Sequence, residues 1–195
     1  MTDLKSTLER LYRLVPLGKK LGLSRMQAAC AAFGNPQLAF PTVHVAGTNG
    51  KGTVTAFVSS IARANGSKVG VYTSPHLMRF AERINIAGQP ISDELLVDLL
   101  NRVMDRAPDL TFFEVATLTA FLAFQEAKID LGVIEVGLGG RLDATNVLPP
   151  PQVVAITRIA YDHMAELGDS LGQIAAEKAG IIKRGSKVVL GKLHP

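Results

Sequence analysis

Short apolar runs bounded by turn residues alternate along the chain with longer stretches that carry apolar residues at helical spacing. Such runs predict strands, and the helical spacing predicts helices between them. The predicted strands cover residues 42–46, 68–73, 131–136, 152–157 and 187–190, and residues 83–92 form a predicted hairpin around Ala87 and Gly88. Because strands this apolar are buried on both faces, the pattern predicts a mostly parallel sheet between two layers of helices.

Helices are predicted before the first strand and between the later ones. They cover residues 4–15, 24–33, 51–65, 93 onward, 114–127 and 170–179, with Pro16 and Gly18 ending the first of them. Ser92 is expected to cap the fourth helix, whose first turn carries Asp93 and Glu94 where the helix dipole favours negative charge. The 195 residues therefore predict a single three-layer α/β domain, with residues 1–40 as a helical lead-in and residues 41–195 as the core.

Composition and charge agree with a globular protein and narrow its partners. Hydrophobic residues make up 47% and charged residues 19% of the chain, which argues against a disordered polypeptide. The net charge of +4 comes from scattered Lys and Arg, densest in residues 18–20 and 181–187. A nucleic-acid surface usually has a stronger basic stripe, so binding of small anions is the better interpretation.

Three features bear on the cellular compartment. A single cysteine, Cys30, excludes an internal disulfide framework and suits a reducing compartment. The N-terminal stretch carries charges at helical spacing and lacks the apolar segment of a signal peptide. The longest apolar run, residues 115–124, is about half the length that a membrane span needs. We therefore expect a cytoplasmic protein without a membrane partner.

The segment HVAGTNGKGTVTAF, residues 44–57, interrupts this pattern with three glycines, one lysine and three threonines. It lies between a predicted strand and a predicted helix N-terminus, where unpaired backbone N–H groups and the helix dipole favour an anion. Its glycines let the backbone curl around phosphate oxygens. Lys51 could neutralise the β- and γ-phosphates, and Thr53 could offer a hydroxyl to a phosphate-bound Mg²⁺. The segment therefore predicts a phosphate-binding loop.

This loop departs from the general pattern G-x-x-x-x-G-K-[ST], because Val45 stands at the first glycine and Gly52 separates the lysine from the threonine. A flexible glycine turn is the alternative interpretation. A P-loop also needs a metal-binding acid at the end of a neighbouring strand, and Glu135 ends such an apolar run. At the carboxyl edge of a parallel sheet its carboxylate would face the ligand crevice. The alternative for Glu135 is an ordinary charge at a strand end.

Six motifs follow one another along the chain: HVAGTNGKGT, YTSPHL, FAERINIAGQPIS, TFFE, EVGLGGRLDATN and AEKAGIIKRG. In this order they resemble the motifs of folylpolyglutamate synthases and bifunctional dihydrofolate synthases, which belong to the wider Mur ligase group. The resemblance extends from about residue 18 to the end of the chain. The combination of GTNGKG, SPHL and GLGGRLDATN is specific, although no single one of them is.

The resemblance implies an ATP-dependent amide ligase. Such an enzyme transfers the γ-phosphoryl group of ATP to a carboxylate, and the amino group of L-glutamate then attacks the acyl phosphate. The carboxylate would belong to dihydropteroate or to a reduced folate that already carries glutamate. The chain resembles only the N-terminal ATP-binding domain, of the Mur ligase central-domain type. Without the second, C-terminal domain we expect a monomer that binds nucleotide and does not complete the ligation.

The resemblance also assigns the nucleotide and metal site. The ATP phosphates would be held by Gly47, Thr48, Asn49, Gly50, Lys51, Gly52 and Thr53. Ser74 and Glu135 resemble ligands of a first Mg²⁺, and His163 resembles a ligand of a second. Lys178 matches a lysine that is carbamylated in relatives, where it could act as a further anionic ligand. Lys51, Glu135, His163 and Lys178 would then be the catalytic residues. Taken from the residues alone, His163 could be a surface histidine and Lys178 a solvated helix lysine.

For the pterin substrate the resemblance points to three segments: Lys20, Leu21 and Gly22, then Thr111, Phe112, Phe113 and Glu114, and finally Leu142, Asp143 and Ala144. The two phenylalanines could equally be core aromatics, and the aspartate could equally form a turn. Ala81 and Ala160 replace residues that are more often polar or glycine in the family, which bears on substrate contacts more than on the reaction class.

Two other functions remain open from the sequence. A Mur-type ligase acting on a cell-wall or other peptide would share the phosphate loop, but TSPHL and RLDATN argue against it. A nucleotide-binding module that is not a ligase would use the same loop for regulation. Release of ADP and phosphate that depends on both a pteroate and glutamate separates such a module from the ligases.

Overall fold

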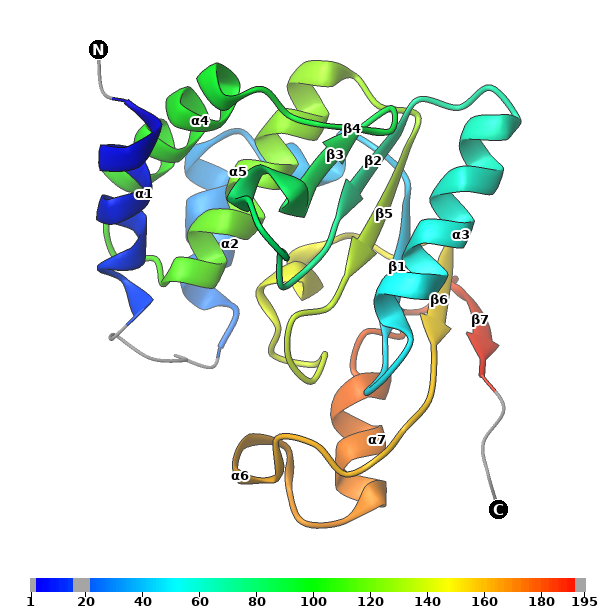
Figure 1. Ribbon diagram of the computed structural model, residues 1–195. Helices are drawn as coiled ribbons and strands as arrows, with labels where there is room; N and C mark the ends of the chain where they lie inside the picture. Colours follow the sequence, from blue (N-terminus) through cyan, green and yellow to red (C-terminus); the bar gives the residue numbers. More distant parts are fainter. Residues whose placement is uncertain (1–2, 16–21, 192–195) are drawn as a thin grey trace.

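The computed structural model describes residues 3–15 and 22–191, in which seven strands form one mostly parallel sheet (Figure 1). The strands are β1 (Thr42–Ala46), β2 (Val69–Tyr72), β3 (Ile84–Ile86), β4 (Gln89–Pro90), β5 (Leu131–Glu135), β6 (Val153–Ile156) and β7 (Lys187–Leu190). Their order is β4-β3-β2-β5-β1-β6-β7, and the five strands from β2 to β7 in this order are parallel. The hairpin of β3 and β4 adds an antiparallel edge. The predicted sheet and hairpin are confirmed.

Helices cover both faces of the sheet, as predicted (Figure 1). They are α1 (Leu4–Tyr12), α2 (Ser24–Ala32), α3 (Lys51–Ala64), α4 (Asp93–Arg106), α5 (Phe112–Ala127), α6 (Met164–Leu167) and α7 (Leu171–Ala179), with short 3-10 turns η2 (Pro36–Leu38), η3 (Phe80–Arg83) and η4 (Ala144–Val147). One core cluster joins α3 to the sheet, and a larger one joins the opposite face to α5, α4, α2 and α1. Helix α7 leads into β7 and is followed by Ile181, which packs against β6.

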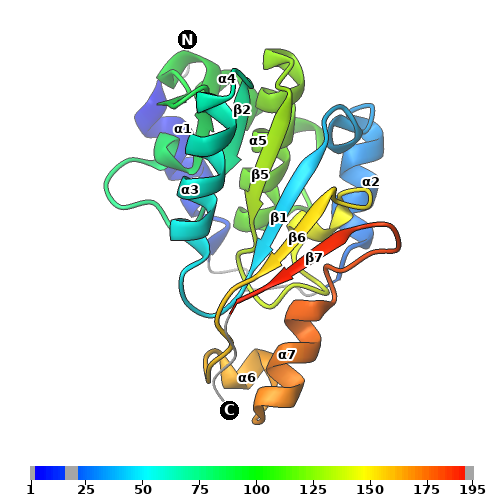
Figure 2. The same ribbon diagram turned by 90° about the vertical axis from the view of Figure 1, so that its right-hand side faces the viewer.

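The structure differs from the predicted pattern in four places. Strand β7 lies at the sheet edge (Figure 2), and its Val189 is 58% exposed, so burial on both faces holds for the central strands and not for this one. Helix α5 begins two residues before its predicted start, because Thr111 and Glu114 form a capping box there. The short helix α6 was not predicted. Helix α1 ends at Tyr12, before its predicted end at residue 15, and Pro16 and Gly18 lie outside the described residues.

The predicted cap of α4 is confirmed, since the Ser92 hydroxyl accepts a hydrogen bond from the Leu95 amide. Cys30 is buried in α2, as a small packed residue. Over residues 3–15 and 22–191, none of the helices has both the length and the apolar character that crossing a membrane requires.

Candidate functional site

The glycine-rich loop connects β1 to α3, and two of its glycines have conformations that other residues rarely adopt. Gly50 caps α3 with φ 85°, in the left-handed region. Gly47 has φ 147°, and a Cβ there would overlap the Thr157 hydroxyl. The conformation of the loop therefore depends on its glycines. The loop leads into the N-terminus of α3, where unpaired backbone amides favour an anion.

Residues that follow β6 hold this loop in place. The Thr48 amide donates to the Arg158 carbonyl at 2.7 Å, and the Thr48 hydroxyl donates to the Ala160 carbonyl at 3.0 Å. The Thr157 hydroxyl donates to the Asn49 carbonyl at 2.8 Å. Because Ala160 contacts the loop through its backbone, its departure from the family pattern leaves these contacts intact.

Two lysines meet at one carbonyl of the loop. Lys51 Nζ donates to the Gly47 carbonyl at 3.1 Å, and Lys178 Nζ, from α7, donates to the same oxygen at 3.2 Å. Lys178 is only 3% exposed, and burial lowers its pKa, as does the charge of Lys51, while Asp162 acts in the opposite direction. Two amines this close favour negative charge between them, which suits a phosphate group.

Glu135 lies beside the loop, as predicted. It ends β5, which is paired with β1, and it is 5% exposed. Burial raises its pKa, and the charge of Lys51 and a hydrogen bond from the Ser74 backbone oppose that shift. A Cβ on Gly52 would have the Glu135 carboxylate as its nearest neighbour, at 3.8 Å. The acid, Ser74 and the start of α3 therefore lie together at the carboxyl edge of the sheet.

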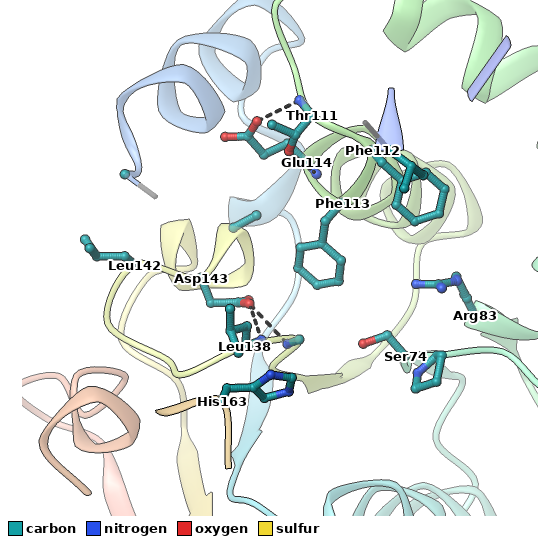
Figure 3. Close-up of a pocket in the computed structure, with 15 residues that line it drawn as sticks. Ser74, Arg83, Thr111, Phe112, Phe113, Glu114, Leu138, Leu142, Asp143 and His163 are labelled. Carbon is teal, nitrogen blue, oxygen red and sulfur yellow. Dashed lines mark hydrogen bonds between the residues drawn. The ribbon is translucent and has the colours of Figure 1, made fainter. Parts of the chain in front are cut away.

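A cavity of about 500 Å³ opens next to this edge (Figure 3). Its lining includes every described member of the predicted pterin site and two predicted metal ligands: Gly22, Thr111, Phe112, Phe113, Glu114, Leu142, Asp143, Ala144, Ser74 and His163. Val15, Pro75, Arg83, Gly137 and Leu138 complete it. Lys20 and Leu21 lie outside the described residues. Segments more than a hundred residues apart are thus brought to one cavity.

The predicted metal ligands are few and of mixed type. The side chain of His163 is about half exposed, and its Nε2 lies 3.6 Å from Asp162. Among residues 3–15 and 22–191, no three His, Cys, Asp or Glu side chains gather as a metal cluster. One carboxylate and one hydroxyl beside a phosphate loop suit Mg²⁺, which keeps waters and takes phosphate oxygens as further ligands. The residues present therefore fit a nucleotide-bound Mg²⁺ and do not form a protein-only metal cage.

The carboxylates of Asp143 and Glu114 accept hydrogen bonds from other groups of the protein. Asp143 accepts hydrogen bonds from the amides of Gly137 and Leu138 (Figure 3). It also accepts hydrogen bonds from the amide and the hydroxyl of Thr145. Burial raises its pKa, and these hydrogen bonds oppose the shift. Glu114 accepts from the Thr111 amide at 2.8 Å and from an Arg25 nitrogen at 3.1 Å. Both line the cavity and shape it, and direct contact with a substrate stays a prediction.

Phe112 and Phe113 both line the cavity, and both also pack, half-buried, against the main core cluster, so each ring contributes to the core and to the cavity wall. Phe112 stacks on Tyr12 with 5.6 Å between ring centres. Phe113 lies against Gly137, where a Cβ would overlap its ring. The two rings give the cavity an aromatic wall.

Sequence reasoning missed two residues of this region. His44, fully buried in β1, contacts the Thr145 hydroxyl at 2.8 Å, and burial together with the charge of Lys183 lowers its pKa to about 3. Arg83 lines the cavity and is 7% exposed. A polar residue inside an apolar strand was a usable signal for His44, whereas no feature of the sequence singled out Arg83.

A glycine-rich loop between a buried strand and a helix, with a carboxylate at the end of the adjacent strand, defines a nucleotide-binding α/β domain of the P-loop type. Residues 45–190 match the Mur ligase middle domain, and the chain belongs to that family.

Curated relatives and solved structures agree with this assignment. The chain is 44% identical over 194 residues to the Bacillus subtilis dihydrofolate synthase/folylpolyglutamate synthase, covering 95% of this chain and 45% of that protein. It is 40% identical to the Lacticaseibacillus casei folylpolyglutamate synthase, covering 97% and 46%. E. coli FolC, solved in complex with DHPP and ADP, superposes with a TM-score of 0.89 at 38% identity, covering 97% and 47%. The chain thus spans about half the length of the relatives it matches.

Proposed function

We propose that this chain is the ATP-binding part of a ligase that joins L-glutamate to dihydropteroate or to a folylpolyglutamate through an acyl phosphate. One observation carries the proposal: Ser74 lines the aromatic cavity and its backbone bonds to Glu135, which lies beside the phosphate loop, while His163 lines the same cavity. The names of the relatives support it, as does a solved structure with Mn, AMPPNP and L-glutamate bound, with a TM-score of 0.89.

The geometry suits phosphoryl transfer to a carboxylate. The loop amides and Lys51 would bind the ATP phosphates, while the aromatic wall holds the pterin substrate so that its carboxylate oxygen faces the γ-phosphorus. That oxygen attacks, the bond to the bridging oxygen breaks, and ADP leaves. The glutamate nitrogen then attacks the acyl carbon and loses a proton to solvent as phosphate departs. Ser74 and Glu135 would hold one Mg²⁺ and His163 a second, and these ions would supply charge neutralisation at the phosphates.

The experiment uses the whole protein, with this chain in its natural context. We expect ADP release to require both a pteroate and glutamate, because phosphate transfer and amide formation share the cavity. Release that ignores both compounds would indicate a nucleotide-binding module, and release that needs a cell-wall peptide would indicate another Mur-type ligase. The 195-residue chain alone should bind magnesium nucleotide without forming product, and repeated turnover by it would contradict the proposed need for the other half.

We propose further that Lys178 becomes carbamylated. Only a neutral amine reacts with carbon dioxide, and burial and the charge of Lys51 lower the Lys178 pKa. With ¹³C-labelled bicarbonate we expect a carbamate carbon signal in NMR spectra of the wild-type chain, growing as the pH rises through that lowered pKa. Lys178→Arg is the control and should show no such signal. An identical signal in both proteins, or none in the wild type, contradicts the assignment.

A further inference from the structure

Arg83 places a cation in the wall of the cavity. It ends η3, is 7% exposed, and lines the cavity beside Phe112 (Figure 3). Its guanidinium carbon lies 5.4 Å from the ring centre of Phe80 and 5.4 Å from that of Phe112. Two aromatic faces therefore hold the guanidinium through cation–π contacts and limit its rotation.

Arg83 forms no ion pair with an Asp or Glu within the described ranges. Its Nε donates to His76 Nδ1 at 2.8 Å, and the guanidinium also interacts with the Tyr72 hydroxyl. The carboxylates of Glu82 and Asp143, which act on His76 and Tyr72, accept hydrogen bonds from backbone amides instead. A buried charge without a counter-charge is costly, and the cost falls when an anion binds against it. The cavity wall is therefore built to receive a negative group at Arg83.

We propose that Arg83 binds a carboxylate of the cavity's ligand, and that His76 is the positioning residue that orients it. The inference rests on the proposed function for the rest of the ligand, a pterin-linked aromatic carboxylate whose rings would contact Phe112 and Phe113. A planar guanidinium matches a carboxylate with two parallel hydrogen bonds, and Nε is already engaged, so its terminal nitrogens serve the ligand.

The contacts of His76 explain how it can fix the guanidinium. Because Arg83 Nε donates to Nδ1, that nitrogen carries no proton, and the ring proton lies on Nε2, 3.5 Å from the Tyr12 hydroxyl. The loop that carries His76 is held by Glu82, whose carboxylate accepts the Leu77 amide at 2.9 Å. The imidazole is therefore anchored on both sides and presents a fixed acceptor to Arg83.

The test compares two ligands that differ only in charge: pteroate and its neutral carboxamide. By calorimetry we expect the wild-type chain to bind pteroate roughly 10- to 100-fold more tightly than the carboxamide, the range for a charged hydrogen-bonded pair. Arg83→Met should bring the two affinities within about threefold of each other, because it weakens pteroate binding far more than carboxamide binding. Retained carboxamide binding shows that the variant is folded.

Two variants of His76 test the positioning role. His76→Asn keeps an acceptor oxygen near the place of Nδ1 and should retain most of the preference for pteroate, whereas His76→Leu should lose it. A merely structural loss would weaken both ligands alike.

The outcomes separate the two proposals. If the wild-type chain binds neither ligand, the proposed function fails and this inference fails with it. If it binds both equally, or if Arg83→Met keeps the wild-type preference, only the role of Arg83 is overturned. If His76→Leu behaves like wild type, the positioning role of His76 is overturned.

Discussion

Lys51→Ala should lower the affinity of the chain for magnesium-bound ATP by roughly 100-fold or more, the range for removing a charge-assisted contact to phosphate in a partly enclosed site. In the structure Lys51 Nζ bonds to the Gly47 and Thr48 carbonyls, at 3.1 and 3.2 Å, so it is already held over the loop. Binding nucleotide exchanges these neutral acceptors for phosphate oxygens. Alanine removes the charge and leaves the glycine-dependent loop conformation in place.

Isothermal titration calorimetry at fixed magnesium measures this change. Lys5→Ala is the matched control, because Lys5 is exposed on α1 and the same charge is removed far from the loop. Its affinity should stay within about twofold of wild type. If Lys51→Ala and Lys5→Ala bind nucleotide equally well, residues 47–53 are not a phosphate-binding loop. The same conclusion follows if the wild type binds no nucleotide.

Local patterns were enough to predict the sheet and the loop. Strand β1 begins and ends where its apolar run does, because a central strand is buried on both faces and the run stops at Gly47. The position of Glu135 also followed from pattern, since adjacent parallel strands end at the same edge. Strand β7 has an equally apolar sequence but lies at the edge of the sheet. Its exposure depends on which strands flank it, and a local sequence pattern does not contain that information.

The cavity depends on contacts that sequence spacing does not reveal. Lys178 bonds to Gly47 across 131 positions, and Thr145 meets His44 across 101. The sequence does not distinguish Arg83 from a surface charge, and only the structure shows that Phe80 and Phe112 lie against its guanidinium. The family resemblance identified the site segments because family members share the same tertiary contacts. It did not indicate that both carboxylate oxygens of Asp143 accept hydrogen bonds from the protein itself.

Asp143→Asn should destabilise the protein strongly. Among the polar residues that line the cavity, we expect it to have the largest effect when each is replaced by its closest neutral analogue. Four donors point at the two carboxylate oxygens: the Gly137 amide at 3.1 Å, the Leu138 amide at 2.9 Å, the Thr145 amide at 3.0 Å and the Thr145 hydroxyl. An asparagine offers one oxygen, so its NH₂ group must face two of these donors. We expect the free energy of unfolding to fall by about 2–4 kcal/mol, because buried donors lose their partners in a fully enclosed network.

Urea denaturation of wild type and variant measures this difference in the free energy of unfolding. Asp109→Asn is the control, because Asp109 is exposed and its substitution should change the free energy of unfolding by no more than about 0.5 kcal/mol. Thr145→Val supplies a second test, because it removes the hydroxyl that links His44 to Asp143. A double variant should then lose less than the sum of the two single losses, as members of one network do. Should Asp143→Asn match wild type, the loop from Gly137 to Asp143 is held by something other than the negative charge of Asp143.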